Sequence, residues 1–62
     1  MRIVDTDNFG GDYPNEQFVL WELPEQAANE IANILNQVEG PNSPRCYKVV
    51  SNDYVLVPGF EP

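Results

Sequence analysis

The chain has no histidine, a single cysteine, and only three lysine or arginine residues against ten aspartate or glutamate residues in 62. Without histidine, the most common general base and the most common metal ligand in proteins are missing. Cys46 has no histidine to activate it, can form no intrachain disulfide, and cannot build the cysteine–histidine pattern of a zinc site. The composition therefore predicts a protein that binds, with no cofactor, no metal and no enzymatic activity.

Positive charge is equally scarce, and the formal net charge is −7. Nucleic acids and anionic membrane surfaces both attract basic patches, so the balance argues against direct binding to either. It is compatible with a basic protein partner, including one whose usual ligand is DNA or RNA. The same charge would also serve simply to keep a small protein soluble.

Long hydrophobic runs are absent, so the sequence predicts neither a transmembrane helix nor the apolar region of a signal peptide. The lone thiol of Cys46 suits a reducing compartment, which favours the cytoplasm. A chain of this size buries only roughly 60% of its unfolded surface and often needs a partner subunit. We therefore expect a homodimer or a higher homo-oligomer.

One amphipathic helix is predicted at residues 24–39. Pro24 suits the first helical position, Glu25 suits the positive end of the helix dipole, and Gly40 is a typical stop. The expected apolar stripe, at spacings of three and four, contains Ala27, Ala28, Ile31, Leu35 and Val38.

Strands are predicted around this helix. Residues 1–4 suggest a short edge strand, 5–16 a polar turn, 17–23 a strand, and 45–50 and 54–57 a closing hairpin with its turn at 51–53. The fold class expected is α+β, with the helix packed on a small antiparallel sheet of three to four strands in one domain, residues 1–62. The second strand is apolar on both faces, which again favours a partner on the open face.

The acidic opening segment resembles a calcium loop in part. Asp5, Asp7, Gly10 and Glu16 fall at ligand or turn positions of the EF-hand pattern, but Phe9 stands where a further oxygen ligand is needed. Since turns are rich in Asp, Asn and Gly for backbone reasons, a polar turn is the better interpretation.

Two groups of residues are candidates for a protein-binding surface. The helix carries a row of uncharged amides at spacings of three and four, which offer donors and acceptors without the desolvation cost of charge. The opening segment contributes carboxylates. The predicted partner-binding residues are Asp5, Asp7, Asp12, Glu16, Asn29, Asn33 and Asn36.

A third group could hold a nucleotide. Arg45, Tyr47 and Lys48 lie close together in one strand, and Trp21 or Tyr54 could stack on a base. In a strand, however, Arg45 and Tyr47 point to one face and Lys48 to the other, so a pocket shared across a dimer is the more plausible form. Edge-strand charges that prevent aggregation are the alternative explanation.

The opening DTDNFGGDYP, the segment YKVV and the ending PGFEP resemble those of short acidic accessory proteins encoded by tailed bacteriophages. The resemblance implies stoichiometric binding, either to block a host enzyme or defence protein or to sequester an immune signalling nucleotide. Our first hypothesis is an inhibitor of a host protein, and the second is an oligomeric nucleotide sponge. A structural or regulatory subunit without inhibitory role is the third.

Overall fold

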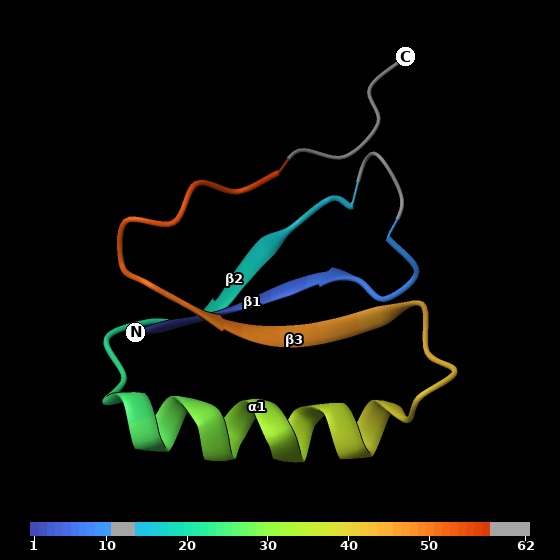
Figure 1. The fold of residues 1–62 in the computed structure, drawn as a ribbon, viewed down its shortest axis with the longest axis horizontal. Coiled ribbons are helices and arrows are strands. Elements are labelled where there is room, and N and C mark those ends of the chain that lie inside the picture. The colour runs from blue at the N-terminus through green and yellow to red at the C-terminus, as the bar shows by residue number, and fades with distance from the viewer. Residues whose placement is uncertain (11–13, 58–62) are drawn as a thin grey trace.

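The computed structural model describes residues 1–10 and 14–57, so the predicted turn residues 11–13 and the tail 58–62 lie outside it. Its elements are β1 (Arg2–Asp7), β2 (Gln17–Leu20), α1 (Glu25–Glu39) and β3 (Arg45–Val50). The three strands form an antiparallel sheet in the order β2-β1-β3, with α1 packed along it (Figure 1). The α+β prediction is thus confirmed.

The first strand differs from its prediction in both place and length. β1 is the central strand of the sheet and runs to Asp7, whereas the sequence suggested an edge strand that stops at Val4. Ile3 and Val4 are fully buried, as expected for successive residues that face opposite sides of a central strand. Asp5 stays in the strand opposite Tyr47, because an arginine from β3 neutralises its carboxylate.

The helix begins and ends where the sequence predicts, within one residue. Pro24 is its extended N-cap, and Gly40 ends it with a φ of 83°, a conformation that glycine adopts without strain. The buried residues of α1 are Ala28 and Ala32. Val38, which was expected in the same apolar stripe as Ala28, is 81% exposed and does not share its burial.

A bulge shapes the second strand. Ile3 pairs with Leu20 while the next residue, Val4, pairs with Phe18, so Val19 is an extra residue between them. Both Val19 and Leu20 consequently pack, half-buried, against the core of Ile3, Ala28 and Ala32. The strand ends at Leu20, earlier than predicted, and the chain then turns.

Residues 54–57, which we call the strap, form no strand, so the predicted closing hairpin is wrong. After a turn in which the Tyr54 N–H donates to the Ser51 carbonyl (3.1 Å), the strap lies on the side of the sheet away from α1 (Figure 1). The strap therefore covers part of the sheet face for which the sequence suggested a partner. None of the described helices is long and apolar enough to cross a membrane.

Candidate functional site

The carboxylate of Glu16 lies between the sheet and the strap, and its side chain is only 2% exposed. The Thr6 hydroxyl of β1 donates to Oε2 (2.6 Å), and the Tyr54 hydroxyl (2.6 Å) and the Val57 N–H (3.0 Å) of the strap donate to Oε1. Lys48 Nζ of β3 lies 3.6 Å from Oε2. The backbone N–H of Glu16 also donates to the Val57 carbonyl (3.0 Å), so this residue ties the strap to the sheet.

These contacts set the charge states of Glu16 and Lys48. Burial alone would raise the pKa of Glu16, but the hydrogen bonds from Thr6, Tyr54 and Val57 and the charge of Lys48 outweigh it and lower the pKa from 4.5 to about 2. The pKa of Lys48 is raised, first by its interaction with Tyr54, whose ring centroid lies 5.1 Å from Nζ, and also by Glu16. The pair is therefore fully ionised near neutral pH.

Arg45 is held on the other side of the sheet by the opening segment. Its Nε donates to Asp5 Oδ1 (2.8 Å), and its two terminal nitrogens donate to the carbonyls of Pro14 (2.6 Å), Asn15 (2.9 Å) and Asp5 (3.3 Å). Because three carbonyls and a carboxylate already receive its donors, the guanidinium works as a clamp on the segment that leads into β2.

Asn36 joins α1 to β3. Its Oδ1 accepts the N–H of Tyr47 (2.7 Å) and its Nδ2 donates to the carbonyl of the same residue (2.8 Å). The Tyr47 hydroxyl donates to Glu39 (3.4 Å), and burial, followed by the charge of Glu39, raises the pKa of Tyr47.

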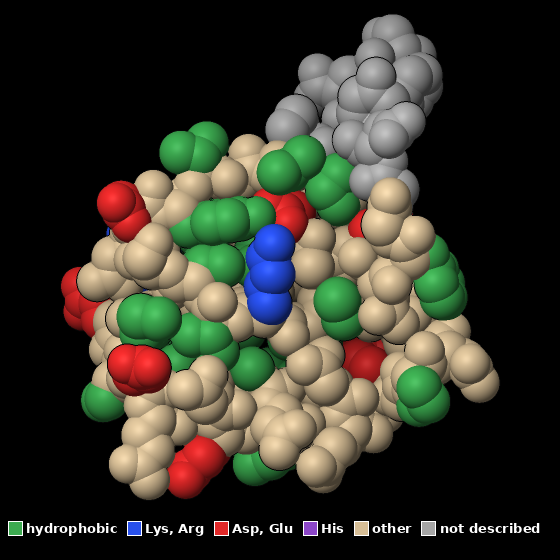
Figure 2. All heavy atoms as spheres, viewed as in Figure 1, with side chains coloured by type: hydrophobic (Ala, Val, Ile, Leu, Met, Phe, Trp, Pro, Cys, Tyr) green, Lys and Arg blue, Asp and Glu red, His purple; other side chains and the backbone are tan. Residues whose placement is uncertain are grey.

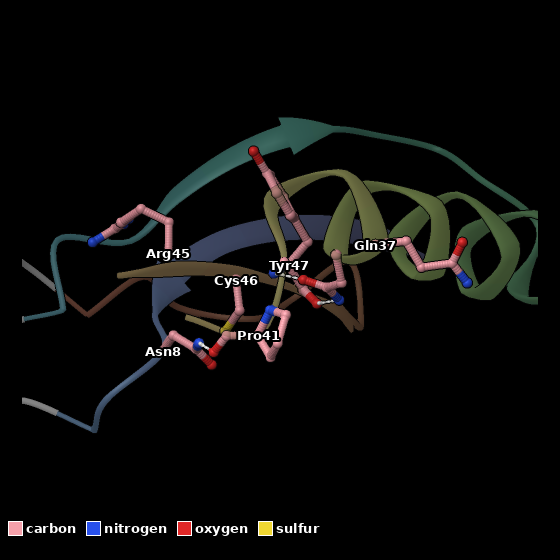
Figure 3. Close-up of a pocket in the computed structure, with 8 residues that line it drawn as sticks. Asn8, Gln37, Pro41, Arg45, Cys46 and Tyr47 are labelled. Atoms are coloured by element: carbon pink, nitrogen blue, oxygen red, sulfur yellow. Dashed lines mark hydrogen bonds between the residues drawn. The ribbon is translucent and has the colours of Figure 1, made fainter. Parts of the chain in front are cut away.

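A shallow concavity of about 650 Å³ lies beside this junction (Figure 3). It is formed by the end of α1, the start of β3 and the loop between them. Its lining residues are Asn8, Asn36, Gln37, Gly40, Pro41, Arg45, Cys46 and Tyr47.

The exposed surface of α1 combines amides with aliphatic side chains. Asn29 and Asn33 are exposed, as the periodicity predicted. Beside them, Ile34 and Val38 are 59% and 81% exposed. Ile34 was not among the predicted residues, although its spacing from Val38 places both on one flank of the helix.

The predicted partner-binding carboxylates do not form one outward surface. Glu16 is buried, Asp5 is ion-paired with Arg45, and Asp7 accepts a hydrogen bond from the Phe9 N–H (3.0 Å). Asp12 lies outside the described residues. Of the three amides, Asn36 is half-buried against β3, which leaves Asn29 and Asn33 available to a partner.

The predicted nucleotide contacts are divided between the two sides of the sheet. Arg45 and Tyr47 line the concavity, whereas Lys48 and Tyr54 belong to the Glu16 cluster on the strap side. Trp21 is 53% exposed and lies 6.3 Å from the Phe18 ring, centroid to centroid. A single subunit thus does not bring these residues together into one pocket.

All three cations have partners within the molecule. Arg45 and Lys48 are ion-paired, and the Arg2 guanidinium lies 5.0 Å from the centroid of the Phe18 ring. In Figure 2, Lys and Arg side chains take up little of the visible face, whereas carboxylates and hydrophobic side chains are spread across it. No cluster of metal-ligating side chains occurs among the described residues.

Comparisons with protein-family models, with curated proteins and with solved structures give no match to this chain. What the chain binds is therefore inferred from the chemistry of its own surface.

Proposed function

We propose that this protein acts by stoichiometric binding to a basic surface of another protein, without catalysis. The observation that supports the proposal is the distribution of charge on the surface. Each of the three cations already has a partner within the chain, while Glu22, Glu25 and Glu30 are exposed. The charge available to a partner is thus negative, and it would steer a basic protein toward this one.

Such binding would inhibit a target whose basic surface normally receives DNA or RNA, because the two ligands would compete for the same cations. The resemblance to acidic phage accessory proteins makes a host defence protein the favoured target, met in the host cytoplasm. The free thiol of Cys46 suits that compartment. Self-association into a homodimer or larger oligomer remains part of the proposal, as does the simpler role of a regulatory subunit.

A nucleotide sponge is the second candidate, and the concavity lined by Arg45 and Tyr47 is the observation that favours it. A phosphate bound there would have to compete with the carboxylate of Asp5 and the carbonyls of Pro14 and Asn15 for the guanidinium. That competition, added to the repulsion of phosphates by a net charge of −7, places this candidate second.

Native mass spectrometry before and after incubation with a bacterial lysate tests the proposal. We expect a shift by the mass of a whole protein in a fixed ratio, and a capture that weakens steeply as salt is added. The matched variant replaces Glu22, Glu25 and Glu30 with glutamine, which keeps the shape of the side chains and removes their charge. It should capture much less of the same protein.

Two results would contradict the proposal. A gain of only a few hundred daltons would point to the nucleotide sponge. Equal capture by the glutamine variant at every salt concentration would show that the acidic surface does not select the partner.

A further inference from the structure

The helix α1 lies to one side of the sheet. Its backbone is close to β3 and β1 but not to β2, and Figure 1 shows β1 and then β2 progressively farther from it. The N–H and carbonyl of Tyr47 both bond to Asn36, so they point away from β1, at the outer edge of β3. Asn36 therefore marks the flank of α1 that faces this edge.

The opposite flank of α1 is aliphatic. Ala27, Ile31, Ile34 and Val38 follow one another at spacings of four, three and four, the pattern of a helix that packs against another helix. At 3.6 residues per turn, Ile31, Ile34 and Val38 lie roughly 160° to 220° around the helix from Asn36, measured in one direction. This flank thus faces the β2 side of the sheet, and both Ile34 and Val38 are largely exposed on it.

Beside the N-terminal half of this flank, the sheet is apolar as well. The bulge places both Val19 and Leu20 on the helix side, where they are half-buried, and Leu23 follows at the entrance to α1. The apolar surface formed by the strand and the flank, which we call the shelf, begins with Val19, Leu20 and Leu23 near the start of α1. It continues along the helix through Ile31, Ile34 and Val38, where the sheet beside it carries the polar residues Asp5 and Gln17.

The dimensions of the shelf fit a helix. Neighbouring strands lie about 4.8 Å apart and a helix is about 10 Å across, so one helix covers about two strands. The third strand, β2, leaves room for a second helix whose axis would lie about 8–10 Å from that of α1. The two-layer α+β architecture is completed when such a helix covers the rest of the sheet.

The charged and polar residues around the shelf indicate which kind of helix could bind there. Glu22 precedes Leu23 at one end of the shelf, and Glu30 lies one turn before Ile34; both are exposed, and α1 carries no lysine or arginine. A second copy of this chain that docked through its own α1 would bring an acidic helix, without lysine or arginine, against these carboxylates. A helix with an aliphatic stripe and cationic flanks meets no such obstacle.

We propose that the shelf is the docking site for a basic amphipathic helix of the partner protein. The proposal rests on the proposed function and deepens it, since it gives the acidic surface a position and the partner a shape. Aliphatic side chains of the docking helix would cover Ile34 and Val38, and its lysines or arginines would approach Glu22 and Glu30.

A synthetic peptide is a direct probe. We would titrate the whole protein with an ~18-residue peptide whose leucines and lysines follow helical periodicity, and with a scrambled peptide of the same composition, by isothermal titration calorimetry. The test variant is Ile34→Ser with Val38→Ser, and the matched control is Gln26→Ser with Gln37→Ser on the neighbouring exposed row. All four side chains are exposed, so both variants should keep the circular dichroism spectrum of the native protein.

We expect the peptide with helical periodicity to bind in a 1:1 complex, and the Ile34 and Val38 variant to bind it at least roughly tenfold more weakly. The control variant should change the affinity less than about twofold. Equal affinities for the two variants, or equal binding of the scrambled peptide, would overturn the proposal.

A second measurement separates this proposal from the function on which it rests. The Ile34 and Val38 variant is exposed to the lysate used for the native protein. If it captures the partner as well as the native protein does, the shelf is not the docking site, although stoichiometric binding stands. If neither protein captures a partner, the proposed function fails, whereas selective binding of the periodic peptide would still support the shelf.

Discussion

Replacement of Glu16 by glutamine tests whether the buried carboxylate holds the strap on the sheet. Glutamine keeps the size of the side chain but removes the charge that three hydrogen-bond donors and Lys48 surround. The fall of the pKa from 4.5 to about 2 corresponds to about 3 kcal/mol of folding free energy from the ionised group. A chain of this length typically has roughly 3–9 kcal/mol in total, so the variant should be strongly destabilised near neutral pH.

The lowered pKa of Glu16 determines in which direction the stability changes with pH. The folded-state pKa of Glu16 lies below the unfolded-state value, so its stabilisation is complete above about pH 4.5 and is lost as the pH falls toward about 2. The native protein should lose this contribution across that window. The Glu16→Gln variant has no such contribution, so the two free energies of unfolding should converge near pH 2.

Urea unfolding followed by the fluorescence of Trp21 measures the free energy at each pH. Glu22→Gln, at an exposed position, is the matched control and should follow the native protein within about 0.5 kcal/mol. If Glu16→Gln does not fold, Tyr54→Phe removes a single donor and should cost about 1 kcal/mol. A difference between native and Glu16→Gln proteins that is the same near pH 2 and near pH 7 would refute the reasoning.

Two further substitutions test the other internal contacts, both by urea unfolding. Asn36→Ala removes both hydrogen bonds to the backbone of Tyr47 and should lower the free energy of unfolding by about 1–2 kcal/mol. The control Asn33→Ala, on the exposed surface, should change it by less than about 0.5 kcal/mol. Equal effects of the two substitutions would contradict the role of Asn36 at the edge of β3. Arg45→Lys keeps the charge but not the planar set of donors, so it should also lower the free energy of unfolding by about 1–2 kcal/mol. A variant as stable as the native protein would show that the clamp on Asp5 and the nearby carbonyls is dispensable.

The elements with strong local signals were predictable from the sequence. α1 has a proline before it, a glycine after it and an amphipathic pattern within it, and β3 has the bounds that its β-branched and aromatic residues suggest. β1 was misplaced because Asp5 and Asp7 are typical of turns. The residue that makes Asp5 compatible with a central strand is Arg45, which lies 40 positions away in the chain.

The prediction of a strand at residues 54–57 was wrong for a similar reason. The sequence YVLV is typical of a strand, but the N–H of Val57 bonds to the Glu16 side chain, 41 positions away, instead of to a neighbouring strand. The sequence offers no local signal for such a pairing. It did suggest a polar role for Glu16, as a ligand or a surface charge, but not its burial.

The candidate surface was predictable only in part. Helical periodicity places Asn29 and Asn33 on the exposed side of α1, as the structure has them. The same periodicity grouped Val38 with Ala28 in one apolar stripe. The helix has two adjacent apolar stripes, and only the position of the sheet decides which one is buried. Asn36 falls within the amide row, but its partner is the backbone of a strand that the periodicity of a helix cannot reveal.

The two edges of the sheet are not equivalent, and this affects how the protein could polymerise. On β3, the amide of Asn36 occupies the outward N–H and carbonyl of Tyr47. On β2, none of the described residues pairs with the outer edge of Gln17–Leu20. A sheet open at both edges can add strands without limit and grow into a fibril, whereas one open at a single edge stops after joining one neighbour. Strand pairing that starts on β2 would therefore meet an obstacle at the opposite edge, where Asn36 already takes the outward hydrogen bonds of Tyr47.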